Sequence, residues 1–130
     1  AFALGAEGVQ MGTRMVSATE SPVHQNWKDR IVGAAETDTV MLNRFHSPAL
    51  RALRTDRATE LELRTQDNVM GEFGNAQDLY FGGNMEAAIA LTGQVCGRID
   101  TVKPVAQIIN EVRVEFFETI SRLGSEYTST

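Results

Sequence analysis

A short apolar strand with a glycine at each end constrains this chain more than any other feature. Val9-Gln10-Met11 lies between Gly8 and Gly12, and residues 1–8 read as the last turn of a helix. Gly5 is placed to end that helix in a left-handed conformation, because glycine has no Cβ to oppose it. A helix, a tight turn and a short strand in this order are typical of α/β repeats, where short loops join helices to parallel strands. The pattern therefore predicts an α/β fold.

Most of the chain after this strand is predicted to be helical. Ser21-Pro22 has the N-cap and first-position residues of a helix, and apolar side chains recur at helical spacing from residue 23 to residue 34. Residues 39–42 suit either a short strand or an extended approach to the next helix, because periodicity over four residues cannot decide. The further helices expected are residues 49–63 with Ser47 as the cap, residues 85–96, and residues 105–123, which carry a clear apolar stripe and end at Gly124.

The composition is that of an ordinary globular chain. Of 130 residues, 42% are hydrophobic and 22% charged, which is too apolar for a disordered chain. Charges or turn residues interrupt every apolar run before the roughly 18 residues that a membrane helix needs. The net charge of −5 argues against nucleic acid as a partner. The single cysteine, Cys96, cannot form an internal disulfide, so we expect a cytoplasmic protein.

Common metal and nucleophile patterns do not occur in the sequence. His24 and His46 are far apart and show none of the spacings that bring about four zinc ligands together, so no metal site is predicted. Cys96 lies in an apolar segment, where a free cysteine usually behaves as a small buried hydrophobe. No serine lies in the Gly-x-Ser-x-Gly elbow of the hydrolases.

The turn after the predicted strand is the strongest candidate for a binding site. Gly12 and Thr13 would stand at the carboxyl end of a parallel strand. Backbone N–H groups can approach an anionic oxygen there without an intervening side chain, and the threonine hydroxyl adds a donor. Loops after the seventh and eighth strands of (β/α)8 barrels hold phosphate in this way. Glycine is also an ordinary way to leave a strand, and from these residues alone that simpler interpretation stays open.

The run from Ala3 to Met15 resembles the eighth-strand motif of the nitronate monooxygenase family, formerly called 2-nitropropane dioxygenases. Further segments that look like this family are Ser21-Pro22-Val23-His24, residues 37–40, residues 49–54 and residues 92–99, so the resemblance covers nearly the whole chain. The family consists of FMN-dependent (β/α)8-barrel enzymes, and a flavin enoyl-ACP reductase shares its fold and motif. The resemblance implies the C-terminal part of a TIM barrel, with the end of the seventh helix and the eighth strand in residues 1–20 and a mostly helical region in residues 21–130.

The resemblance also implies which residues approach the flavin. The residues matched to the FMN site are Gln10, Met11, Gly12 and Thr13, with the last two amides at the phosphate. Gly93-Gln94 matches a helix start near the flavin pocket, and Tyr80 matches a position on the substrate side. Neither histidine matches the family's catalytic histidine, so no catalytic residue is expected in this chain.

The function implied for the whole enzyme is the oxidation of an alkyl nitronate, with electrons passing through FMN to O2. A barrel of this kind takes about 250 residues, so we expect a fragment that is inactive on its own and marginally stable. An FMN-dependent enoyl-ACP reductase and an NAD(P)H:quinone reductase of the same fold would share the phosphate turn. Both stay open as alternatives, as does a non-catalytic helical fragment, and the sequence does not give the oligomeric state.

Overall fold

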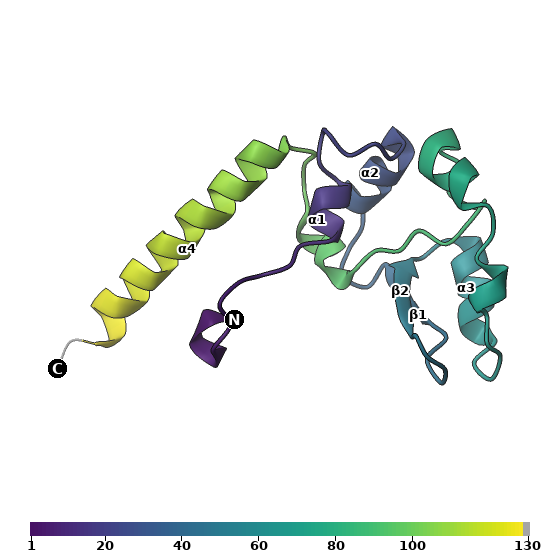
Figure 1. Ribbon diagram of the computed structural model, residues 1–130, viewed down its shortest axis with the longest axis horizontal. Helices are drawn as coiled ribbons and strands as arrows, with labels where there is room; N and C mark the ends of the chain where they lie inside the picture. The colour runs from purple at the N-terminus through teal and green to yellow at the C-terminus, as the bar shows by residue number, and fades with distance from the viewer. Residues whose placement is uncertain (129–130) are drawn as a thin grey trace.

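A body of short elements and one long C-terminal helix make up the fold (Figure 1). The structure is a computed structural model and describes residues 1–128. In chain order the elements are η1 (Phe2–Leu4), α1 (Thr13–Val16), α2 (Gln25–Val32), β1 (Thr39–Leu42), β2 (Leu50–Leu53), α3 (Asp56–Leu63), η2 (Met70–Glu72), η3 (Asp78–Gly82), η4 (Gln94–Arg98) and α4 (Val105–Tyr127). The η elements are single turns of 3-10 helix, except for η3, which is a turn of π-helix.

The N-terminal segment confirms the glycine turn but not the strand. Gly5 has a φ of 92°, and its N–H donates to the Phe2 carbonyl, so η1 ends in the left-handed conformation that was expected. The prediction of a strand at residues 9–11 is wrong for this structure, since the segment runs alone from η1 to α1 (Figure 1). A strand needs a neighbour for its N–H and C=O groups. Within residues 1–128 no segment pairs with it.

Residues 39–42 form a strand, which decides the choice that the sequence left open. β1 and β2 pair antiparallel, with Thr39 opposite Leu53 and Leu42 opposite Leu50. The helix predicted for residues 49–63 is therefore wrong in its first half. Its second half is α3, which begins after Thr55, whose hydroxyl accepts a hydrogen bond from the Ala58 N–H at 3.1 Å. Pairing with β1 outweighs the helical spacing of the leucines in this short run.

Two further helix predictions need correction. The N-cap of α2 is His24 rather than Ser21, because the His24 Nδ1 accepts from the Asn26 N–H at 3.1 Å. Residues 85–96 do not form a helix. The Leu53 N–H donates to the Ala90 carbonyl and the Ile89 N–H donates to the Phe73 carbonyl, so this segment is held by backbone bonds to β2 and to the chain after η2. Its last residues belong to η4.

Strand β2 supplies side chains to both apolar clusters of the body. Successive side chains of a strand point to opposite faces, and accordingly Leu53 packs in one cluster while Ala52 packs in the other. The first cluster comprises Val23, Trp27, Ile31, Leu53, Leu79, Ala88, Ala90, Cys96 and Ile99. The second comprises Val40, Leu42, Ala52, Ala58, Leu61, Val69 and Ile89.

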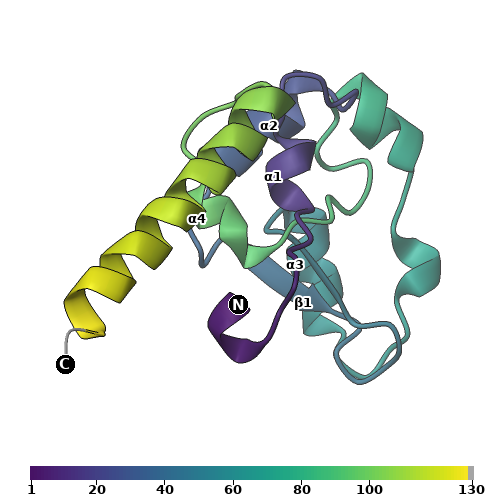
Figure 2. The same ribbon diagram turned by 60° about the vertical axis from the view of Figure 1, so that its left-hand side comes forward.

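Helix α4 leaves the body after its first turns, as Figure 2 shows. The Glu20 carboxylate accepts from the Val105 N–H at 2.9 Å and ties the helix start to the body. The helix continues through Gly124 to Tyr127, so the predicted end is wrong. An interior glycine destabilises a helix by about 1 kcal/mol. The other residues of this 23-residue helix offset that loss. Only Ile108 is buried, and the ring of Phe116 lies 4.7 Å from that of Phe2. No helix of the described residues is long and apolar enough to cross a membrane.

Glu86 caps helix α3 from a distant part of the chain. Its two carboxylate oxygens accept from the Asp56 N–H at 3.2 Å and the Arg57 N–H at 2.9 Å, where a negative charge also complements the helix dipole. We expect Glu86→Gln to lower the free energy of unfolding of the full-length protein by about 1 kcal/mol. Urea unfolding would measure this change. Glu60→Gln, within α3 itself, is the control for loss of a negative charge. Equal effects of the two variants would contradict the capping role.

Candidate functional site

The predicted phosphate turn is the N-terminus of helix α1. Gly12 is the residue before the helix and Thr13 its first residue. A Cβ built on Gly12 would meet nothing within 4 Å, so the backbone at this point faces open space. The first N–H groups of a helix have no partner within it. The turn therefore offers backbone donors on an unobstructed side.

The Thr13 side chain is buried and holds a defined hydrogen bond. Only 8% of Thr13 is exposed, and its Oγ1 accepts from the Gly93 N–H at 2.9 Å. Because the hydroxyl oxygen accepts this bond, its one proton is left for another acceptor. Within residues 1–128 the structure provides none. The pairing brings the turn together with Gly93-Gln94, the second segment singled out in the sequence.

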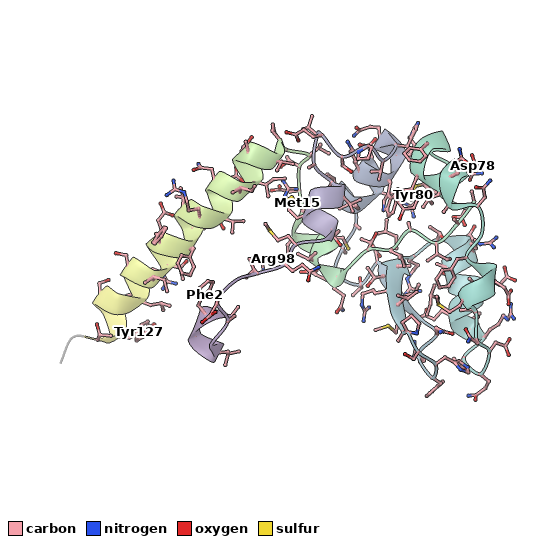
Figure 3. All side chains as sticks on the ribbon, in the orientation of Figure 1. Phe2, Met15, Asp78, Tyr80, Arg98 and Tyr127 are labelled. Atoms are coloured by element: carbon pink, nitrogen blue, oxygen red, sulfur yellow. The ribbon has the colours of Figure 1, made fainter. Side chains whose placement is uncertain are left out.

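Of the other predicted residues, two directly precede the turn and one lies apart from it. Gln10 is exposed and Met11 half-buried, and both belong to the link that leads into α1. Tyr80 lies in η3, where its ring meets that of Trp27 edge-on at 4.8 Å. Figure 3 shows Tyr80 well separated from Met15 in α1. The structure therefore brings together Gly12, Thr13 and Gly93, but it does not bring Tyr80 to them.

Arg14, the residue after Thr13, is engaged by groups of the chain itself. Its guanidinium donates to the Thr101 carbonyl at 2.7 Å and to the Ser17 hydroxyl at 3.3 Å. The Thr101 hydroxyl donates to the Asp100 carboxylate and holds the pKa of that carboxyl below its usual range. These contacts connect α1 to the segment that leads into α4.

The two histidines and the cysteine make contacts within the fold, and these contacts do not form a metal or nucleophile site. His24 caps α2, and the His46 Nε2 lies 3.1 Å from the Gln66 carbonyl. Among the described residues, no group of three or more His, Cys, Asp and Glu side chains is arranged to hold a metal ion. Burial raises the pKa of the Cys96 thiol, which disfavours the thiolate that a nucleophile requires.

Sequence patterns gave no sign of a buried pair that lies next to the turn. The Trp27 indole N–H donates to the Thr92 hydroxyl at 3.3 Å, and Thr92 precedes the glycine that donates to Thr13. The two residues are 65 positions apart. A tryptophan in an apolar stripe is interpreted as core, and no spacing rule links it to a distant threonine. Only the folded arrangement identifies this pair.

Comparison with known proteins decides the family. A family model described as nitronate monooxygenase matches residues 1–115. The chain belongs to the nitronate monooxygenase family. A Staphylococcus aureus protein named as a nitronate monooxygenase is 40% identical over 50 residues, which cover 38% of this chain and 14% of that protein. A Mycobacterium tuberculosis protein named as a monooxygenase is 26% identical over 136 residues, covering 95% of this chain and 36% of that protein.

A solved structure extends this nitronate monooxygenase family match to the fold. FabK from Thermotoga maritima superposes with a TM-score of 0.86 and 40% identity, over 95% of this chain and 41% of that chain. This chain therefore spans about two fifths, or less, of the length of these relatives. Its fold class is confirmed as α/β, the C-terminal portion of the TIM barrel of these relatives. The family is one of oxidoreductases, as the sequence resemblance implied.

Proposed function

We propose that this chain provides the phosphate-binding arm of an FMN site in an enzyme that oxidises alkyl nitronates with O2. The observation that carries the proposal is the buried Thr13 hydroxyl, which accepts from the Gly93 N–H and keeps its proton for an outside acceptor. A phosphate oxygen is such an acceptor. The family assignment gives the class of reaction.

The residues of the turn fit a phosphate group. The Gly12 and Thr13 amides would donate to its oxygens together with the Thr13 hydroxyl. Gln10 and Met11 would form the adjoining wall. The open space beside Gly12 lets a ligand approach the backbone closely. Bound FMN would supply the redox chemistry, for which the protein gives orientation and electrostatics.

Proton transfer is assigned to a part of the enzyme outside this chain. The His24 Nδ1 already accepts a bond from the Asn26 N–H, and a Cβ on Gly83 would lie 2.3 Å from that nitrogen, so the ring is packed against the chain. His46 contacts a backbone carbonyl. We therefore propose that the chain alone is inactive.

The cytoplasmic location of the enzyme also stays a prediction.

The second candidate is an FMN-dependent enoyl-ACP reductase, and the match to FabK favours it. That match covers 95% of the chain at 40% identity. The phosphate turn does not separate the two reactions, because both would hold FMN in the same way. An NAD(P)H:quinone reductase of this fold is a variant of the same alternative.

Three assays on the full-length protein, reconstituted with FMN, test these proposals. Nitronate-dependent O2 uptake without NADH is the expected result. NADH oxidation that depends on an enoyl thioester or on a quinone, with no nitronate turnover, would replace the first proposal by the second. Failure of the protein to bind FMN would overturn both.

A further inference from the structure

We propose that Thr92, held by the indole of Trp27, is a positioning residue that orients the Thr13 hydroxyl through the Gly93 amide. The inference rests on the proposed phosphate site and adds two residues to it. Neither would touch the flavin. Both residues would instead set the direction in which the Thr13 hydroxyl proton points.

The Thr92 hydroxyl is fixed because it both accepts and donates a hydrogen bond. The oxygen accepts from the Trp27 Nε1–H at 3.3 Å, and the hydroxyl proton is donated to the Ala90 carbonyl at 3.1 Å. Trp27 is 1% exposed and Thr92 is 3% exposed, so water does not compete freely for these bonds. The tryptophan ring is itself held edge-on by Tyr80. The Thr92 side chain is thereby held to the first apolar cluster, while its backbone N–H donates to the Arg51 carbonyl in β2 at 3.1 Å.

Gly93, the residue after Thr92, connects the fixed Thr92 to the turn. The Gly93 N–H donates to the Thr13 Oγ1 at 2.9 Å. A Cβ on Gly93 would lie 3.4 Å from that oxygen, so the two residues are in direct contact. A free threonine hydroxyl rotates and also bonds to nearby backbone groups. Because the Gly93 N–H occupies one side of the Thr13 oxygen, the hydroxyl proton points to another side, where it is free for an outside acceptor such as phosphate.

The test compares FMN with riboflavin, which lacks the phosphate, on the full-length protein. Thr92→Val removes the hydroxyl and keeps the shape of the side chain. We expect it to raise the Kd for FMN roughly tenfold, the loss of one hydrogen bond to a charged group, and to leave the Kd for riboflavin unchanged. Thr92→Ser, which keeps the hydroxyl, should bind FMN like the wild type. Thr59→Val is the matched control, because it removes a hydroxyl that bonds to the Thr55 carbonyl in α3.

A double-mutant cycle assigns the effect to Thr13. Once Thr13→Val has removed the hydroxyl, Thr92→Val should weaken FMN binding no further, because coupled residues are not additive. If Thr92→Val does not fold, Trp27→Phe removes the indole donor together with part of the ring, and a loss of FMN binding without a matching loss of riboflavin binding is again expected.

The outcomes separate this inference from the proposed function. Equal weakening of FMN and riboflavin by Thr92→Val would show a general structural role and overturn the inference. An unchanged FMN Kd in Thr92→Val, with Thr13→Val weakened, would overturn the inference and leave the phosphate site standing. Wild-type protein that binds FMN no more tightly than riboflavin would overturn the phosphate site itself.

Discussion

Gly12→Val is expected to empty the full-length protein of FMN while leaving its fold intact. A Cβ at this position meets no atom of residues 1–128 within 4 Å, so the added side chain has room in this part of the enzyme. The same side chain would stand where a phosphate must approach the Gly12 and Thr13 amides. Loss of two hydrogen bonds to a charged group corresponds to about 3 kcal/mol or more, which is a Kd for FMN roughly a hundredfold higher.

Absorbance of the purified protein at flavin wavelengths measures the FMN content of Gly12→Val. Gly71→Val is the matched control, because a Cβ there also meets nothing within 4 Å and the residue lies in η2, away from the turn. The control should keep its flavin. Normal flavin content in Gly12→Val would disprove the phosphate site, whatever the reaction of the enzyme.

Gly74→Ala should cause the largest loss of stability among single glycine replacements considered for this chain. Gly74 has a φ of +88°, and a Cβ on it would lie 2.1 Å from the Ala87 carbonyl oxygen. The opposing segment is fixed there, since the Asn75 N–H donates to the same carbonyl at 2.8 Å. Left-handed strain of about 1–2 kcal/mol and overpacking of about 1–3 kcal/mol add up to about 3 kcal/mol of lost unfolding free energy.

Gly5→Ala separates the two causes of that loss. Gly5 has nearly the same φ, +92°, but its Cβ would meet nothing within 4 Å. Its replacement should therefore show the conformational strain alone. Chemical unfolding of both variants of the full-length protein gives the comparison. If Gly74→Ala costs no more than Gly5→Ala, the close approach of the two backbones is not present in the protein.

Long periodic elements could be predicted from the sequence, and short paired ones could not. Helices α2 and α4 carry apolar stripes over several turns, so their existence was predicted correctly even where their ends were not. β2 was predicted as helix because four residues with leucines at both ends fit either period. Its conformation is set by β1 and by Ala90, whose carbonyl accepts from the Leu53 N–H.

The candidate site could be predicted in part, because its motif is local. The order Gly12-Thr13 after an apolar run makes the turn a candidate for phosphate, and the resemblance to the family adds to it, so the site stays a prediction. The bond from Gly93 to Thr13 and the fixing of Thr92 by Trp27 depend on tertiary packing. No pattern along the chain encodes which distant amide will meet a given hydroxyl, and these contacts are visible only in three dimensions.

The bond between Thr13 and Gly93 also determines when in folding the turn is completed. It joins residues 80 positions apart, with both apolar clusters formed by chain that lies largely between them. Closing so long a loop costs entropy that only the intervening packing offsets. We therefore expect the oriented hydroxyl to form late in folding. Partly folded chains would lack it, and selective retention of a phosphate-bearing flavin would mark only those molecules whose folding is complete.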